Sequence, residues 1–433
     1  MREMKYSGVE WMEDIPASWN MIRFKDKYQS IKEIAGESSS EYERLALTLG
    51  GVIKRPKDDS EGLQPKAFDG YQILRENDFV FKMIDLQNVS TSRVGLSPYT
   101  GLVSPAYIRF CSKNKNQFNK FVYYYLMSMY YNCVFNSLGG DGVRSALNAS
   151  DMGMLMIPFP SEHEQMLIVE AIESQTDKVD ALIANQEAQI VKLKAYKQSL
   201  ITEVVTKGLD PNVPMKDSGV EWIEKIPEGW NAVPLKTLFD FGKGLPITKE
   251  NLVEEGIPVI SYGQIHAKWN SGVTIHEELK RFVNKEYLET NPSCLVKKGD
   301  FIIADTSEDR EGCGNAAYVD TDDTIFAGYH TVILISKKPN VDNKYLAYLF
   351  LTDAWRSQLR KRVSGIKVFS VSRKFLSETS VLIPDNASKM VELLDEKCSH
   401  IDKLISIKQQ KIERLNQYKK SIIYEYVTGK KEV

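Results

Sequence analysis

Hydrophobic residues recur every three to four positions in two segments that lie far apart in the chain. Between about 162 and 207 the sequence contains no glycine or proline, so one uninterrupted helix is predicted there. The same spacing returns near residue 400. The first apolar stripe consists of Ile168, Ile172, Val179, Leu182, Ile183, Ile190, Leu193, Leu200 and Val204, and the second of Ile401, Leu404, Ile405, Ile412, Leu415 and Ile422.

The two stripes predict that the helices pack against each other. A helix of about 45 residues is roughly 65 Å long at a rise of 1.5 Å per residue, which is too long to bury its stripe against a small domain. We expect an antiparallel pair that carries one domain at each end. Polar residues interrupt the stripes at Gln186, Lys197, Lys408 and Lys419, and such residues commonly fix the register of paired helices. The alternative is that each helix packs separately on its own domain.

The chain also contains two pairs of repeated segments. Residues 5–26 and 216–237 are identical at twelve of 22 positions, with a constant offset of 211. Residues 179–207 and 401–429 are identical at twelve of 29 positions, with an offset of 222. Identical segments should fold alike, so the repeats predict two halves that are related by approximate two-fold symmetry.

The regions between the repeated segments, 27–157 and 238–383, share almost no identity by eye. Gene duplication followed by drift would blur all parts of the chain equally. A retained scaffold with divergent regions instead suggests that the two regions recognise different things. Short runs rich in β-branched and aromatic residues predict strands within 71–83, 101–110, 257–265, 295–305 and 324–336, and aromatic-rich segments predict core helices at 118–131 and 342–356.

These patterns predict an α+β fold with two tandem recognition domains of mixed α/β structure. Each domain is followed by a long helix, and the two helices pair as an antiparallel coiled coil with intramolecular pseudo-two-fold symmetry. The predicted ranges are 1–160 and 209–384 for the recognition domains, and 161–208 and 385–433 for the long helices.

Composition narrows the class of protein without deciding its function. The chain has 433 residues, of which 42% are hydrophobic and 26% are charged, and no apolar run approaches the length of a membrane span. Its five cysteines are scattered and form no CxxC pair, so we expect a reducing, cytoplasmic location. The net charge of −2 neither supports nor excludes nucleic-acid binding, because a whole-chain sum can hide a local basic surface.

Basic residues gather in one segment of the second half. Residues 356–374 carry seven Lys or Arg residues and no acidic residue, and we expect them to form a glycine-containing loop that contacts DNA. The glycine-rich segment 137–148 precedes an Ile-Pro pair, as 356–374 does, so we expect the two to be equivalent loops. For any one cation a solvated surface charge is the alternative. The candidate DNA-binding residues are Arg356, Arg360, Lys361, Arg362, Lys367, Arg373, Lys374, Arg144, Lys54, Arg55, Lys57 and Arg93.

Motifs for catalysis are absent from the sequence. It contains no phosphate-binding GxxxxGK[ST] loop, no GxGxxG fingerprint and no HExxH motif. The acidic group Glu308, Asp309 and Glu311 suggests a metal site, but a solvated turn is the favoured interpretation.

Several short sequence motifs together resemble those of the specificity subunits of type I restriction-modification systems, and the resemblance covers essentially the whole chain. The two opening blocks read SGVEWMEDIPASW and SGVEWIEKIPEGW, the segment 299–304 reads GDFIIA, and the helices end in SLITEVVTKG and SIIYEYVTGK. The helix entry at 160–165 belongs to the same set. One departure is that Pro384 is not followed by the Glu-Gln of the first copy, which blurs where the second helix begins.

The resemblance implies a DNA-reading subunit that performs no chemistry of its own. Each of its two target-recognition domains would read one half of a split site in double-stranded DNA, and the helix pair would set the spacer between the halves. Two methylation subunits that use S-adenosylmethionine would dock on the helices, and restriction subunits that use ATP and Mg would join for cleavage, so this chain itself would need no cofactor and no metal. The competing hypotheses are a self-contained methyltransferase or nuclease, and a repeated coiled-coil scaffold that binds proteins rather than DNA.

Overall fold

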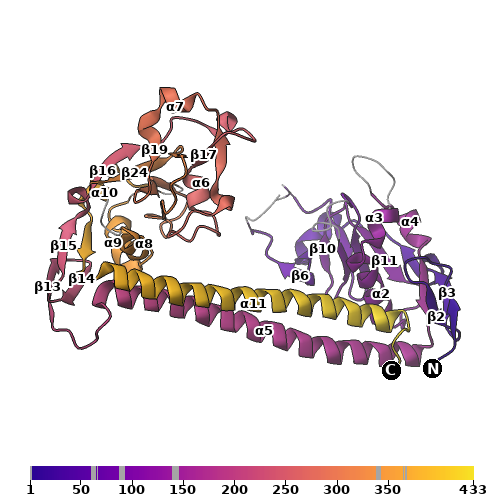
Figure 1. The fold of residues 1–433 in the computed structure, drawn as a ribbon. Coiled ribbons are helices and arrows are strands. Elements are labelled where there is room, and N and C mark those ends of the chain that lie inside the picture. The colour runs from indigo at the N-terminus through magenta and orange to yellow at the C-terminus, as the bar shows by residue number, and fades with distance from the viewer. Residues whose placement is uncertain are drawn as a thin grey trace. The chain divides into compact units, whose positions relative to one another are not determined.

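The structure, a computed structural model, describes residues 2–59, 65, 67–86, 93–138, 146–337, 343–363, 365 and 368–433 (Figure 1). The chain forms two compact units, which are described separately. Unit 1 consists of Met1–Glu187 and Gln409–Val433, and unit 2 of Ala188–Lys408. Each unit therefore contains a part of both long helices. The domain ranges expected from the sequence stay a prediction.

Both long helices are present as predicted. Helix α5 spans Glu162–Lys207 and helix α11 spans Ala387–Val427. In the described part of the chain, no helix has the length and apolar character needed to cross a membrane.

The helices run antiparallel within each unit. In unit 1, Gln175 Nε2 donates a hydrogen bond to the Tyr426 hydroxyl at 2.6 Å, and Lys419 Nζ lies 2.6 Å from Asp180 Oδ2. Residue numbers thus fall along one helix as they rise along the other, which confirms the predicted antiparallel pairing.

Unit 2 repeats the ion pair of unit 1 with equivalent residues. Lys197 Nζ lies 2.6 Å from Asp402 Oδ2, and at the repeat offset of 222 Lys197 corresponds to Lys419 and Asp402 to Asp180. The same bridge is therefore made once in each unit, as pseudo-two-fold symmetry requires. Both bridges are partly exposed, and such pairs contribute about 0–1 kcal/mol, so their main effect is on helix register.

The predicted apolar stripe is buried over most of its length but not everywhere. Ile172 and Ile422 are almost fully buried, whereas Leu182 and Leu404 are 46% and 37% exposed. The prediction was wrong at these two leucines. They occupy equivalent positions in the repeat, so the same point of the stripe turns away from the partner helix in both units.

Unit 1 is built from short strands and helices around two four-stranded sheets. The sheet orders are β4-β11-β8-β9 and β6-β5-β10-β7, and the smaller pairs are β1-β2 and β12-β3. The elements are β1 (Met4–Tyr6), β2 (Asp14–Pro16), β3 (Asn20–Arg23), α1 (Phe24–Lys27), β4 (Tyr28–Ser30), η1 (Gly36–Glu41), β5 (Arg44–Thr48), β6 (Gly51–Arg55), β7 (Gln72–Leu74), β8 (Phe79–Lys82), β9 (Arg93–Leu96), β10 (Gly101–Val103), β11 (Ile108–Ser112), α2 (Lys120–Tyr131), α3 (Val134–Leu138), α4 (Ala149–Gly153) and β12 (Met156–Phe159).

Unit 2 has two four-stranded sheets of the same design, ordered β16-β24-β20-β22 and β18-β17-β23-β19, with the pairs β13-β14, β15-β26 and β21-β25. Its elements are β13 (Met215–Val220), β14 (Ile223–Pro227), β15 (Asn231–Pro234), η2 (Leu235–Thr237), β16 (Phe239–Lys243), η3 (Lys249–Asn251), β17 (Ile257–Ile260), α6 (Tyr262–Ile265), η4 (Glu277–Leu279), β18 (Arg281–Val283), α7 (Tyr287–Thr290), η5 (Pro292–Cys294), β19 (Leu295–Val296), β20 (Phe301–Ala304), β21 (Thr306–Ser307), β22 (Ala316–Tyr318), β23 (Ile325–Ala327), β24 (Thr331–Ser336), α8 (Lys344–Phe350), α9 (Asp353–Arg360), β25 (Phe369–Ser370), α10 (Arg373–Glu378) and β26 (Ser380–Ile383).

The two sheet pairs share one topology although the variable regions share almost no sequence. Each contains one parallel pair between otherwise antiparallel strands. In unit 1 it joins β5 to β10 through Leu102 and Arg44, and in unit 2 it joins β17 to β23 through Val259 and Phe326. The mixed α/β recognition domains of the predicted fold are therefore confirmed, and the two heads are copies of one architecture.

A pair of equivalent asparagines links the sheet to the following helix in each unit. Asn119 Nδ2 donates to the Asn77 carbonyl at 3.0 Å, and Asn343 Nδ2 donates to the Gly299 carbonyl at 2.9 Å. Asn77 and Gly299 both have a left-handed backbone, with φ of 63° and 96°. Asparagine and glycine are the residues that tolerate this conformation best, so different sequences encode the same turn.

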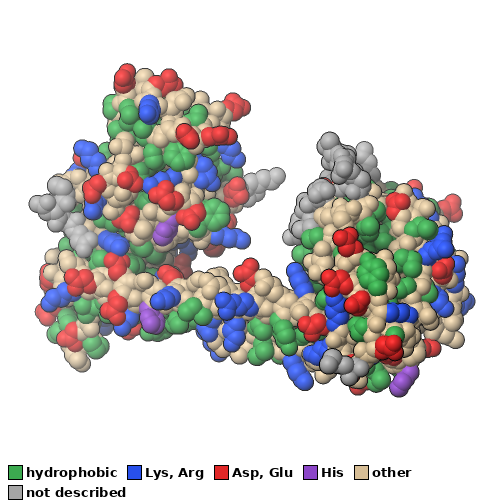
Figure 2. All heavy atoms as spheres, turned by 45° about the vertical axis from the view of Figure 1, so that its right-hand side comes forward, with side chains coloured by type: hydrophobic (Ala, Val, Ile, Leu, Met, Phe, Trp, Pro, Cys, Tyr) green, Lys and Arg blue, Asp and Glu red, His purple; other side chains and the backbone are tan. Residues whose placement is uncertain are grey.

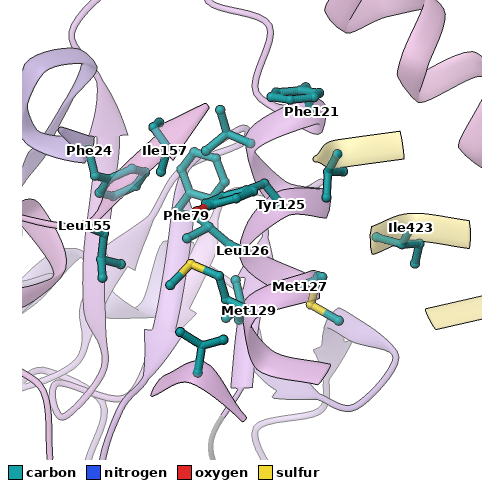
Figure 3. Close-up of a cluster of buried hydrophobic side chains, with 14 of the residues drawn as sticks. Phe24, Phe79, Phe121, Tyr125, Leu126, Met127, Met129, Leu155, Ile157 and Ile423 are labelled. Atoms are coloured by element: carbon teal, nitrogen blue, oxygen red, sulfur yellow. The ribbon is translucent and has the colours of Figure 1, made fainter. Parts of the chain in front are cut away.

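The aromatic helices lie in the core, as predicted. Phe121 and Tyr125 of α2 belong to one buried cluster with Phe79 of β8 and Ile423 of α11 (Figure 3). The cluster joins the sheet, the short helix and the long helix of unit 1.

Two predicted elements in unit 2 were wrong in detail. The segment 342–356 forms two helices rather than one, because the Thr352 side chain accepts a hydrogen bond from Trp355 N and starts α9 separately. The segment 257–265 is a strand only as far as Ile260. Gln264 Oε1 then accepts a hydrogen bond from Ser261 N, which caps the short helix α6.

Candidate nucleic-acid interface

Three loops of unit 2 meet at the end of the sheet where β20 stops. They are the segment after β17, the segment after β20 and the turn between β23 and β24. His266 Nε2 lies 2.9 Å from the Thr306 carbonyl oxygen, and its Nδ1 lies 3.0 Å from Asn315 Nδ2. Thr306 Oγ1 in turn lies 3.4 Å from His330 Nδ1. These contacts make the loop surface continuous.

This loop surface contains two open pockets. One of about 700 Å³ mixes acidic, basic and aromatic side chains, and its lining includes Lys249, Tyr262, Gln264, His266, Glu308, Asn315, Tyr329 and Arg356. The other, of about 410 Å³, is lined by Lys243, Asp305, Thr306, His330, Thr331, Val332, Ser370, Val371, Ser372 and Arg373. Hydrogen-bonding groups of several kinds converge here, as expected of a surface that reads base edges.

Arg373 and Lys374 are the best placed of the predicted cations in this unit. Both lie in the first turn of α10 and are exposed. Among the residues that the structure describes, neither side chain forms a hydrogen bond or an ion pair. Their charges are therefore available to phosphate groups.

Arg356 and Arg360 are not on a loop, contrary to the expectation for 356–374. Both belong to α9, where Arg356 Nε donates to the Phe350 carbonyl at 2.7 Å, and burial lowers the pKa of Arg356 to about 10. Arg360 bonds to Asp353 at 2.8 Å and to the Glu311 carbonyl at 2.7 Å. Much of the bonding capacity of these two guanidinium groups is used within the fold.

Lys361 and Arg362 face acidic side chains of their own unit. Lys361 Nζ lies 2.5 Å from Glu221 Oε1, and this hydrogen bond, together with the lysine charge, lowers the pKa of that carboxyl. Arg362 lies 3.1 Å from Glu378 Oε2. Lys367 lies outside the described residues. The role of these residues in DNA binding stays a prediction.

Three of the predicted cations of unit 1 gather around one basic pocket. Lys54, Arg55 and Lys57 line a pocket of about 460 Å³ together with Arg44, which the sequence analysis missed. Arg44 pairs directly across the strands with Arg55. Glu41 and Glu43 also line the pocket, Glu43 pairs with Lys54, and Arg55 pairs with Asp59, so these charges are partly compensated within the unit. Figure 2 shows Lys and Arg side chains beside Asp and Glu side chains over much of the visible surface.

Another pair of facing cations lies at the end of β8. Lys82 pairs across the strands with the predicted residue Arg93, and the sequence analysis missed Lys82. Burial lowers the pKa of Lys82, and the charge of Arg93 lowers it further. A phosphate group near these side chains would relieve their repulsion.

The described ends of the two segments 137–148 and 356–374 correspond, while much of the first segment lies outside the described residues. Ala146 forms an isolated bridge with Ile84 after β8, and Ser370 pairs with Thr306 after β20. Asn148 and Ser372 then cap the helices α4 and α10. Arg144 lies outside the described residues.

The acidic group of the loop after β20 forms a turn. Asp309 Oδ1 accepts a hydrogen bond from Gly312 N at 2.6 Å. Over the described ranges, no set of three or more His, Cys, Asp or Glu side chains is arranged to hold a metal ion.

Comparisons with known proteins cover nearly the whole chain. The sequence model of the family described as "Type I restriction modification DNA specificity domain" matches residues 52–192 and 227–417. The chain is 24% identical over 422 residues to the type I restriction enzyme MjaVIII specificity subunit of Methanocaldococcus jannaschii, covering 96% of this chain and 93% of that protein. It is 22% identical over 444 residues to the putative type I restriction enzyme MjaX specificity subunit of the same organism, covering 96% and 94%.

A solved structure has the same fold. It is a chain from the work described as "Structural basis underlying complex assembly and conformational transition of the type I R-M system", with a TM-score of 0.66 and 13% identity. The match covers 96% of this chain and 99% of that chain.

Proposed function

The chain belongs to the type I restriction-modification DNA specificity family, and from this membership we propose that it selects the DNA sequence on which a type I restriction-modification complex acts. Each recognition domain reads one half of a bipartite target, and the paired helices set the number of unread base pairs between the halves. The observation that carries the proposal is the repetition of one domain topology with different side chains at the corresponding loops. A shared scaffold with unlike reading surfaces suits an asymmetric target.

The basic pockets suit the phosphate backbone and the mixed loop surface suits base edges. Lys and Arg side chains at phosphates position a protein on the duplex without reading sequence, whereas hydrogen-bonding groups in the groove supply specificity. Arg44 and Lys57 in unit 1 and Arg373 in unit 2 are assigned to the first class.

The chemistry of the complex is assigned to other subunits. We propose that two methylation subunits bring S-adenosylmethionine and that restriction subunits bring ATP and Mg, while this chain is non-catalytic. The helix pair is the proposed docking site of the methylation subunits, because it is the part of the chain that both halves share. The scaffold hypothesis, in which the chain binds only proteins, is not favoured by the family membership.

Methylome sequencing tests this function directly. The full chain is expressed in a methylation-free host, alone and together with its methylation subunits. Adenine methylation at one bipartite motif, only when both are present, is the expected result. Methylation by this chain alone would make it an enzyme. No methylation in either strain would leave the scaffold hypothesis in place, and a salt-dependent gel shift of the assembled complex then decides between them, since a protein scaffold does not bind DNA.

A further inference from the structure

The turn between β23 and β24 holds a histidine in a strained and well-fixed backbone conformation. His330 has a φ of 55°, which places it in the left-handed region that L residues rarely adopt. The carbonyls of Tyr329, His330 and Thr331 accept hydrogen bonds from Tyr262, Asp305 and Gly244, respectively. Backbone strain of this kind persists only where the surroundings enforce it, and it is concentrated at functional sites.

Close packing fixes the position of this turn further. A Cβ atom added to Gly328 would overlap with Ser261 Oγ, and one added to Gly244 would overlap with the Gly328 carbonyl oxygen. The turn therefore lies directly against two neighbouring segments. A side chain carried by such a turn is presented in one defined position, as the reading of a base edge requires.

The imidazole of His330 is exposed but held in orientation. Its side chain is 57% exposed, and its ring lies 5.3 Å from the Tyr262 ring at 78° and 6.0 Å from the Tyr329 ring at 76°. Two edge-to-face aromatic neighbours restrict the ring without covering it. The side chain stands beside both pockets of the loop surface, because Tyr262 lines one and His330 lines the other.

The contacts around His330 favour one tautomer of its imidazole ring. Thr306 Oγ1 donates to Asp305 Oδ1 at 2.8 Å, so its hydrogen is used. His330 Nδ1 lies 3.4 Å from Thr306 Oγ1 and 3.6 Å from Asp305 Oδ1, and both of these oxygens are then acceptors. A neutral ring with its proton on Nδ1 satisfies both contacts, and it leaves Nε2, which has no hydrogen-bond partner among the described residues, as an acceptor.

The scaffold itself does not require this histidine. The corresponding turn in unit 1 lies between β10 and β11, and the strand pairings on both sides of it place Ala106 where unit 2 has His330. The two turns thus differ in side chain and in backbone, since His330 has a positive φ and Ala106 does not.

We propose that His330 reads a base edge in the half-site bound by unit 2, with Nε2 accepting a hydrogen bond from the exocyclic amino group of an adenine or a cytosine in the major groove. Tyr262 and Tyr329 position the ring, and Asp305 with Thr306 fixes its tautomer. This assignment rests on the proposed function of the chain as a DNA-sequence selector and adds to it the residue that discriminates at one base pair.

The test uses the full chain assembled with its methylation subunits. His330→Ala removes the acceptor, and His330→Gln supplies an amide oxygen instead. His276→Ala is the matched control, since His276 is exposed and lines neither pocket. The measurements are the methylome motif and competition binding between the cognate duplex and duplexes changed at single base pairs.

In the His330→Ala complex we expect discrimination at one base pair of one half-site to fall by about 5-fold, the lower end of the range for a bidentate base contact, because His330 offers a single acceptor. The other half-site and the salt dependence of binding stay unchanged. His330→Gln recovers part of the discrimination, and His276→Ala behaves as the wild type. Should His330→Ala be unstable because of its backbone, His330→Gly accepts the left-handed conformation and gives the same expected result.

An unchanged motif and unchanged discrimination in His330→Ala overturn the inference, while wild-type methylation at a bipartite motif keeps the proposed function. If the wild-type complex methylates no bipartite motif, the proposed function itself fails. Failure of the inference about His330 is therefore seen in the variant complex, and failure of the proposed function is seen in the wild-type complex.

Discussion

At the scale of single residues, the repeated segments contact one another. The end of each long helix packs against one of the two repeated opening blocks. Gly429 follows α11 with a φ of 70°, and Gly208 follows α5 with a φ of 82°. An added Cβ at Gly429 would overlap with Pro16 and lie 3.1 Å from Trp19, and one at Gly208 would lie 3.3 Å from Trp230. Each helix thus ends on the tryptophan of a repeated block, which explains why both segments are retained together.

Replacing Gly429 by alanine is expected to destabilise unit 1. Gly8→Ala is the matched control, because Gly8 also has a positive φ, 80°, but no atom lies within 4 Å of its added Cβ. We expect about 1–2 kcal/mol from backbone strain in both variants and a further loss in Gly429→Ala from the overlap with Pro16. Denaturant unfolding followed by tryptophan fluorescence measures both. Equal losses in the two variants would show that the contact with the block does not contribute.

At the scale of elements, each short core helix is attached to a long helix by an equivalent set of a lysine, a tyrosine and a carboxylate. In unit 1, Lys120 and Tyr124 of α2 both bond to Glu173 of α5, at 2.8 and 3.4 Å. In unit 2, Lys344 and Tyr348 of α8 bond to Asp395 of α11, at 2.8 and 2.6 Å. Burial and the neighbouring carboxylate raise the pKa of both tyrosines, so these hydroxyls remain donors at neutral pH.

Removing the carboxylate of Asp395 should weaken the attachment of α8 to α11. Asp395→Ala leaves the hydroxyl of the buried Tyr348 without this acceptor, and we expect a loss of about 1–3 kcal/mol. Amide hydrogen exchange should accelerate in α8 more than in the strands of unit 2. Asp395→Glu reproduces the residue type of unit 1 and should restore protection, and uniform acceleration throughout the unit would argue against a local tie.

The contribution of an ion pair between the long helices to stability can be measured at Lys197 and Asp402. Asp402→Lys places two cations together at Lys197, and Lys197→Asp places two carboxylates together. Each single variant should lose stability, and the double variant should regain it, with a coupling energy of about 0.2–1 kcal/mol for a partly exposed pair. A double-mutant cycle by denaturant unfolding gives this energy. A coupling of zero would mean that apolar packing alone sets the register.

At the scale of the whole molecule, repeats and periodicity predicted the architecture because they constrain elements directly. The long helices, their antiparallel pairing and the two mixed domains follow from the stripe and the repeats. The common topology of the heads did not, because different residues such as Asn77 and Gly299 support the same turn. Charge counting placed Arg356 and Arg360 on a loop, whereas both lie on α9 and bond to neighbours within the fold. Their role in DNA binding stays a prediction. Arg44 and Lys82 were missed because strand pairing, not sequence distance, brings each beside another cation.

Whether a cation already bonds to other residues of its unit decides how informative its variants are about DNA binding. Reversing Arg360 and Lys361 to glutamate is expected to weaken DNA binding, but it also breaks bonds to Asp353 and Glu221 within unit 2. A loss of binding in that variant would therefore have two explanations. Lys54 pairs with Glu43, and Lys57 Nζ donates to the Ser39 carbonyl at 2.8 Å. Glutamine keeps a hydrogen-bond donor at both positions and adds no like charge, so it is the sharper replacement there.

Replacing Lys54 and Lys57 by glutamine should reduce the salt dependence of DNA binding by the assembled complex. Each lost phosphate contact lowers the slope of log K against log salt by about 0.9, so a fall of up to about 1.8 is expected. The methylation motif should stay the same, because phosphate contacts carry no sequence information. Lys397→Gln on α11, which removes an exposed cation paired with Glu396, is the control and should leave the slope unchanged. A motif that changes in the double variant would instead place this pocket at base edges, and an unchanged slope would place it away from the DNA.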